Sequence, residues 1–148
     1  MQIVGNYNFN AGDLELELAG LTQGTEFDHL DILGDLTLGN AVLDVFLIDG
    51  FTLGVNQWFD IISVAGTLTG QFDGLDELAV VGSFGHLDLR ITYTAGDGND
   101  IALFTRPTLP GDIDADGFVG ISDLNLVLAN WNQNVPPADP LADPTGDG

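Results

Sequence analysis

The sequence predicts an all-β fold followed by a small helical unit, and three observations lead to this prediction. Between residues 5 and 105, apolar residues occur in short, often alternating runs, with glycines between the runs and no helix-period segment. Alternation with a period of two is typical of half-buried strands, and glycine marks the turns between them. After residue 111 an aspartate-rich loop precedes apolar residues at helical spacing. The 148 residues suffice for one compact body and an appendage.

The clearest strand lies at residues 14–18. Leu14, Leu16 and Leu18 alternate there with acidic residues, which places the leucines on one face and the carboxylates on the other. Further apolar runs predict strands at residues 30–33, 36–38, 41–48, 58–64, 78–81, 87–93 and 101–104. Short strands separated by glycine turns predict a β body over residues 1–105.

Two arrangements of these strands fit the pattern, a β-sandwich and a parallel solenoid. Hairpins of a sandwich are favoured by the Asp-Gly pairs at residues 49–50, 73–74 and 97–98. The solenoid is favoured by a loose echo between residues 31–39 and 61–70, where an apolar strand meets glycine and a Thr/Leu strand that ends in glycine. Repetition at about this spacing is typical of stacked coils.

The order of glycine, leucine and aromatic residues also resembles the C-terminal end of passenger-type β-helices. The resemblance rests on residues 5–7, 12–18, 26–34, 49–51 and 58–62. Such segments occur in autotransporter-like surface proteins and in large secreted proteins of planctomycete-like bacteria. The resemblance implies a right-handed parallel β-helix terminus and an extracellular or cell-surface location. We therefore expect the β-helix, with the β-sandwich as the alternative.

The charge balance narrows the choice of partners. The chain has 23 acidic residues, two arginines and no lysine, which gives a formal net charge of −21. This charge repels nucleic acid and anionic membrane surfaces and favours divalent cations. No apolar run approaches the roughly 18 residues of a membrane helix, so we expect no membrane insertion. Cysteine is absent, and His29 and His86 have no suitable nucleophile nearby in the sequence, so we predict no catalytic residue.

The β pattern ends at Pro107 and Pro110, which cannot extend a ladder or a helix. We therefore place a linker at residues 106–111 and a second domain at residues 112–148. A helix over residues 121–131 is predicted by apolar residues at intervals of three and four, namely Ile121, Leu124, Val127, Leu128 and Trp131.

Residues 112–123 have the spacing of an EF-hand calcium loop. Carboxylates stand at loop positions 1, 3, 5 and 12, which are Asp112, Asp114, Asp116 and Asp123. Gly117 at position 6 permits the sharp turn that brings these side chains together. Calcium takes six to eight oxygen ligands, and the carbonyl of Phe118 is the expected ligand at position 7.

The alternative is an acidic turn that only caps the helix, with Ser122 or Asp123 as the N-cap residue. Four carboxylates that converge without a metal would repel one another. The spacing therefore favours a calcium site.

A loop with one following helix and aspartate at position 12 resembles the dockerin module of cellulosome-type assemblies. The match covers residues 111–132, and residues 143–148 resemble the start of a second loop, with Asp143, Thr145 and Asp147 at its positions 1, 3 and 5. Dockerins pair two loop-helix units and bind a cohesin domain through their helices. The resemblance implies that Ile121 and Ser122 set the choice of partner.

These observations predict a non-catalytic, calcium-binding part of a secreted or cell-surface protein, anchored to a cohesin-like domain by its dockerin-like module. The alternative is part of a carbohydrate-active β-helix enzyme, a polysaccharide lyase or hydrolase, that uses the module as an anchor. Carboxylates and an arginine clustered on one solenoid face would favour that enzyme. The sequence identifies no particular glycan.

Overall fold

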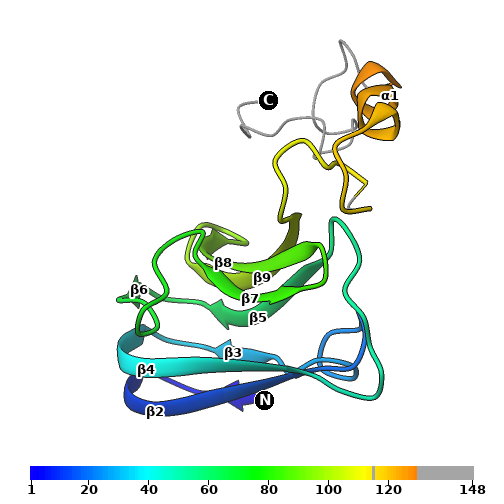
Figure 1. The fold of residues 1–148 in the computed structure, drawn as a ribbon. Helices are drawn as coiled ribbons and strands as arrows, with labels where there is room; N and C mark the ends of the chain where they lie inside the picture. Colours follow the sequence, from blue (N-terminus) through cyan, green and yellow to red (C-terminus); the bar gives the residue numbers. More distant parts are fainter. Residues whose placement is uncertain (115, 130–148) are drawn as a thin grey trace.

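The computed structural model describes residues 1–114 and 116–129. A β body is followed by a short loop and a helix that lie beside one end of it (Figure 1). The expected second loop with Asp143, Thr145 and Asp147 lies outside the described residues. Within the described part, no helix has the length and apolar character needed to cross a membrane.

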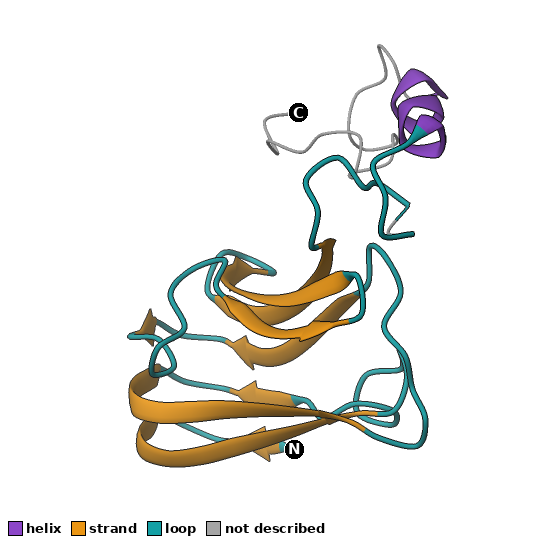
Figure 2. Cartoon of the chain, in the orientation of Figure 1, coloured by secondary structure: helices purple, strands orange, loops and turns teal. Residues whose placement is uncertain are grey.

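The predicted all-β class is confirmed, and the strands form two sheets (Figure 2). The six-stranded sheet has the order β1 (Gln2–Ile3), β3 (Leu30–Ile32), β5 (Trp58–Val64), β9 (Asp100–Pro107), β8 (Leu87–Ala95) and β7 (Val80–Phe84). The three-stranded sheet has the order β2 (Tyr7–Leu18), β4 (Leu36–Leu47) and β6 (Leu68–Thr69). The helix of the described part is α1 (Ile121–Ala129).

Strands β1 to β6 alternate between the two sheets. Each of the first four strands pairs in parallel with the strand two places further along the chain, so that β1, β3 and β5 form one ladder and β2, β4 and β6 another. The echo seen in the sequence is a structural repeat, because Ile32 pairs with Val64 and Leu36 with Leu68. Parallel neighbours need a crossover connection, and here the strand of the other sheet provides it.

Glycines stack where the chain passes from one sheet to the other. A Cβ atom on Gly34 would lie 2.5 Å from the backbone of Gly5, and one on Gly66 would lie 2.7 Å from the backbone of Gly34. Beside them, the backbone N–H of Thr67 donates to Oδ1 of Asp35 at 2.9 Å. Only residues without a side chain permit successive turns to approach this closely.

The parallel ladder ends at β9, which pairs antiparallel with both β5 and β8. The Asp-Gly pair at residues 97–98 lies in the β8–β9 hairpin, as its sequence indicates. In the same turn the Asn99 side-chain amide donates to the carbonyl of Gly66, and Oδ1 of Asp100 accepts the backbone N–H of Val64 at 2.7 Å. The hairpin therefore occupies the place that a further parallel strand would take.

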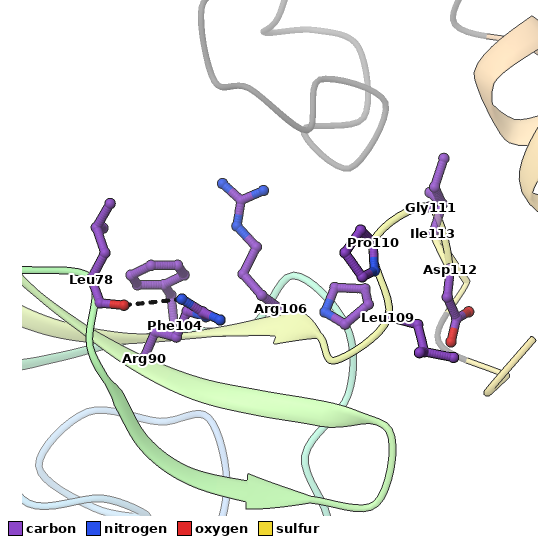
Figure 3. Close-up of a pocket in the computed structure, with 10 residues that line it drawn as sticks. Leu78, Arg90, Phe104, Arg106, Leu109, Pro110, Gly111, Asp112 and Ile113 are labelled. Atoms are coloured by element: carbon purple, nitrogen blue, oxygen red, sulfur yellow. Dashed lines mark hydrogen bonds between the residues drawn. The ribbon is translucent and has the colours of Figure 1, made fainter. Parts of the chain in front are cut away.

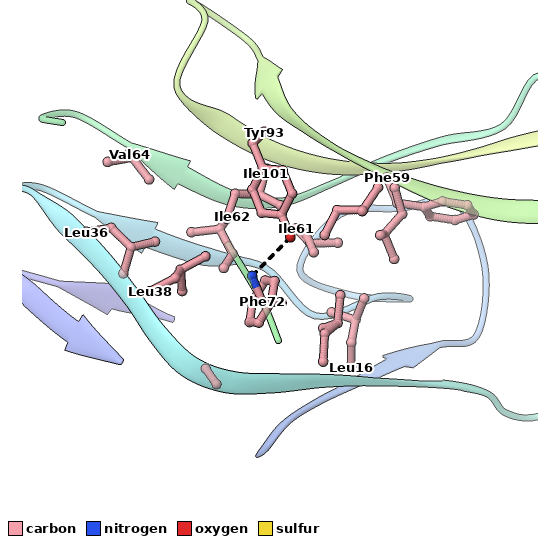
Figure 4. Packing of buried hydrophobic residues seen from close by; sticks show 14 of the residues in the cluster. Leu16, Leu36, Leu38, Phe59, Ile61, Ile62, Val64, Phe72, Tyr93 and Ile101 are labelled. Carbon is pink, nitrogen blue, oxygen red and sulfur yellow. Dashed lines mark hydrogen bonds between the residues drawn. The ribbon is translucent and has the colours of Figure 1, made fainter. Parts of the chain in front are cut away.

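The core lies between the sheets and is apolar (Figure 4). Phe59 is fully buried and packs edge to face against Phe27, with ring centroids 5.3 Å apart. The hydroxyl of Tyr93 donates to the carbonyl of Leu75 at 2.8 Å and accepts the backbone N–H of Phe72 at 3.1 Å. Burial raises the pKa of Tyr93 to about 12, so this hydroxyl stays protonated.

The end of the β body differs from the sequence-based expectation. Strand β9 continues into the expected linker, where Arg106 pairs with Asp88 and Pro107 with Leu87. Proline lacks an N–H to donate, but at the last position of the strand this costs little. The described helix ends at Ala129, and residues 130 and 131, which we expected to continue it, lie outside the described residues.

Candidate metal site

Three aspartates of the predicted calcium loop come together. One carboxylate oxygen of each of Asp112, Asp114 and Asp116 lies within 4.8 Å of the others. Asp112 is fully buried, whereas the other two are exposed. This group could hold a metal ion, and its all-oxygen donor set is the kind that hard divalent cations prefer.

Backbone N–H groups hold these carboxylates in place. The N–H of Asp116 donates to Oδ1 of Asp112 at 3.1 Å and to Oδ1 of Asp114 at 3.2 Å. The N–H of Phe118 donates to Oδ1 of Asp116 at 2.8 Å, and the Phe118 side chain is 76% exposed. This bond holds Phe118, whose carbonyl we expect as a ligand, next to the aspartate group.

Gly117 is required at loop position 6 for two reasons. Its φ is +92°, a backbone angle that residues with a side chain rarely adopt. A Cβ atom there would also lie 2.6 Å from the ring of His86. His86 belongs to the turn between β7 and β8, so this contact seats the loop on the β body. The N–H of Gly117 also donates to Oδ2 of Asp112 at 2.9 Å. Sequence reasoning gave His86 no role, because nothing local connects it to the loop.

Asp123 lies outside the group of three aspartates. Its Oδ1 accepts the N–H of Ile113 at 2.6 Å and that of Asp114 at 3.3 Å, while its Oδ2 accepts the N–H of Gly120 at 2.6 Å. These backbone donors, led by Gly120, hold the pKa of Asp123 below its usual value. Through these bonds the Asp123 carboxylate joins the start of the loop to the start of the helix.

The N-cap residue of α1 differs from the two residues considered in the sequence analysis. The first helical hydrogen bond runs from the N–H of Leu124 to the carbonyl of Gly120, which makes Gly120 the N-cap residue rather than Ser122 or Asp123. Asp123 is the third helical residue, and its bond to the Gly120 N–H is one half of a capping box. Glycine is among the residues tolerated at the N-cap position, and Asp123 satisfies its N–H.

The surroundings of Asp114 disfavour the charged form of its carboxyl group. Partial desolvation, followed by the charges of Asp116, Asp123 and Asp112, raises the pKa of Asp114. A bound divalent cation would reverse this preference, because it attracts all the carboxylates at once.

The helix leaves apolar side chains in solvent. Ile121 is 69% exposed, Leu124 50% and Leu128 57%, and Ser122 is exposed as well. Asp123 is the one buried residue recorded for α1. The two positions that the resemblance assigns to partner choice, Ile121 and Ser122, are therefore both exposed.

Comparison with known proteins does not identify a relative of this chain. Family models, curated proteins and solved structures give no match to the chain.

Proposed function

We propose that residues 112–123 bind one calcium ion and that this loop and α1 form a dockerin-like anchor of a secreted or cell-surface protein. The observation that carries the proposal is the convergence of Asp112, Asp114 and Asp116 at alternate positions before Gly117. Calcium accepts irregular sets of six to eight oxygens, whereas magnesium requires near-ideal octahedral geometry. The Phe118 carbonyl and water complete the shell in this proposal.

Asp123 couples calcium binding to the helix in this proposal. Its carboxylate caps α1 and holds the N–H groups of Ile113 and Asp114. In the proposed bound state, one Asp123 oxygen turns to the ion while the other keeps its bond to Gly120. Ion binding then stabilises the first helical turn and presents Ile121 and Ser122 to a cohesin-like domain.

For the β body we propose the last coils of a right-handed parallel β-helix, closed by the antiparallel strands β9, β8 and β7. The alternation of β1 to β6 between two parallel ladders supports this, as does the stacking of Gly5, Gly34 and Gly66. Right-handed crossovers are strongly preferred between parallel strands. The body thus serves as a non-catalytic scaffold.

One observation favours the alternative of a carbohydrate-active enzyme. Arg90, Arg106 and Asp88 lie on one face of the six-stranded sheet, as register and strand alternation require. Asp88, however, is largely buried and already accepts hydrogen bonds from Ser83 and Arg90. It is thereby held in a structural role, and we retain the anchor as the primary proposal.

Calorimetric calcium titration with parallel circular dichroism tests the calcium proposal. The chain should bind one ion with a gain of helical signal, and the double variant Asp112→Ala, Asp116→Ala should lose both. The matched control Asp13→Ala, Asp44→Ala removes two exposed aspartates from the β body and should bind as the parent chain does. No heat at millimolar calcium, or equal loss in the control, would contradict the proposal.

A further inference from the structure

Both basic residues of the chain line one pocket. Arg90 and Arg106 project from the outer face of the six-stranded sheet (Figure 3). The pocket has a volume of about 340 Å³ and lies between this face and residues 107–113, which lead into the metal site. With a net charge of −21, the rest of the surface repels anions, so this is the place where an anion meets positive charge.

An aromatic surface adjoins the two guanidinium groups. Trp58 pairs with Phe104 across β5 and β9, and Phe104 pairs with Arg90 across β9 and β8. The Trp58 and Phe104 rings are stacked, with centroids 5.5 Å apart and planes 22° apart. The Arg106 guanidinium carbon lies 5.9 Å from the Phe104 ring centre. Trp58, Phe104 and Arg90 thus form a row across three strands. Neighbouring strands are about 4.8 Å apart, so this row is about 10 Å long.

These side chains are held in position before any ligand arrives. Arg90 donates through Nη1 to the carbonyl of Leu78 and through Nη2 to Oδ2 of Asp88, both at 3.1 Å. Leu78 has a φ of +65° and is 52% exposed, a strained conformation for leucine that places its carbonyl under Arg90. The indole N–H of Trp58 donates to Oδ1 of Asp60 at 2.6 Å, which fixes the ring although half of it is exposed.

Arg106 is left available for a ligand. The Arg90–Asp88 pair is the ion pair recorded for the described part of the chain, and Arg106 forms none there. A guanidinium group that stacks on an aromatic ring keeps its N–H donors free at the edge, where a carboxylate can accept two of them.

We propose that this pocket binds a carboxylate-bearing sugar, a uronic acid unit of an acidic polysaccharide. Arg106 binds the carboxylate, and the exposed face of Trp58 with Phe104 packs against the apolar face of a sugar ring. The length of the row accommodates more than one ring of a chain. An acidic peptide offers the carboxylate without a flat apolar face, so the stacked rings favour the sugar. This site goes beyond the calcium anchor. Asp112 lines the pocket as well, but the groups proposed to bind the sugar, Arg106 and Trp58, are not calcium ligands.

The test is a titration with trigalacturonic acid in metal-free buffer, because calcium could otherwise bridge the sugar to the acidic loop. Binding is followed by calorimetry and by amide chemical shifts of β5, β8 and β9. Saturable binding is expected, and both Arg106→Gln and Trp58→Ala should weaken it about tenfold or more. Arg106→Lys, which keeps the charge and loses the planar fork, should fall in between.

The controls separate this site from general adhesion. Phe46→Ala removes an aromatic residue that is 48% exposed on the other sheet and should bind as the parent chain does. Neutral maltotriose should not compete. The proposal is overturned if trigalacturonic acid does not saturate, if Arg106→Gln binds equally well, or if a triglutamate peptide binds more tightly. Failure here would leave the calcium titration untouched.

Discussion

The β body and the loop-helix unit are stabilised in different ways. The body encloses a continuous apolar core in which Phe59, Leu18 and Leu103 are fully buried. In the described residues beyond 110, the buried side chains are Ile113 and two aspartates, Asp112 and Asp123. The nine residues of α1 are too few for a stable isolated helix. The difference teaches that the body can fold by burying apolar surface, whereas the described part of the loop-helix unit is held mainly by hydrogen bonds to its carboxylates.

The largest expected change in stability comes from a substitution in the core of the β body. Phe59→Ala removes a fully buried ring from the contact with Phe27 and should lower the free energy of unfolding by about 3–5 kcal/mol. Urea denaturation followed by far-ultraviolet circular dichroism measures this. Phe46→Ala, an exposed counterpart, should change the value by less than about 0.5 kcal/mol. Similar losses in both variants would mean that the core does not hold the body.

A smaller effect concerns the polar contact inside the core. Tyr93→Phe leaves the Phe72 N–H and the Leu75 carbonyl without their partner and should cost about 1–3 kcal/mol. Tyr7→Phe, which removes the hydroxyl of a partly buried tyrosine at the start of β2, is the matched control and should cost less. Equal costs would show that the buried network adds nothing beyond the ring.

The smallest expected change in stability concerns the loop-helix unit, whose stability depends on pH. The raised pKa of Asp114 means that the metal-free fold binds this proton more tightly than the unfolded chain does, so stability falls as pH rises through that pKa. The lowered pKa of Asp123 acts in the opposite sense, and its stabilisation is lost as pH falls below the ordinary aspartate value of about 3.9.

Without metal, the helical signal should therefore pass through a maximum in mildly acidic buffer. With saturating calcium, the maximum should vanish, because acidification then only displaces the ion. Circular dichroism across this pH range measures both curves. A metal-free signal that rises steadily towards pH 7 would contradict the assigned roles of Asp114 and Asp123.

The strands could be predicted from the sequence because their apolar residues alternate or cluster. The run at residues 58–64 coincides with β5. Strand β2 begins at Tyr7 and β4 runs through residues 39–41, beyond the predicted ends, because their long mutual ladder overrides the polar residues there. The two-residue strand β1 has no pattern of its own and exists through pairing, whereas β6 coincides with the Thr/Leu strand of the echo at residues 61–70.

The three clustered aspartates of the site could also be predicted, because their spacing is local. The contact of His86 with Gly117 could not, since it joins distant parts of the chain. The row of Trp58, Phe104 and Arg90 likewise depends on the antiparallel register of three strands. The exposed apolar residues of α1 were predicted as a helical face, but the sequence does not reveal that this face lacks cover from the described chain.

The most direct test of the central claim is a calcium titration of the ¹⁵N-labelled chain, followed residue by residue in its amide spectrum. Shifts that saturate at one equivalent should appear at Gly117, whose N–H bonds to Asp112, and at Ile113 and Gly120, whose N–H groups bond to Asp123. Core amides such as that of Leu103 should stay unchanged. An absence of shifts at millimolar calcium, or shifts spread over the acidic strands without saturation, would contradict a calcium site in this loop.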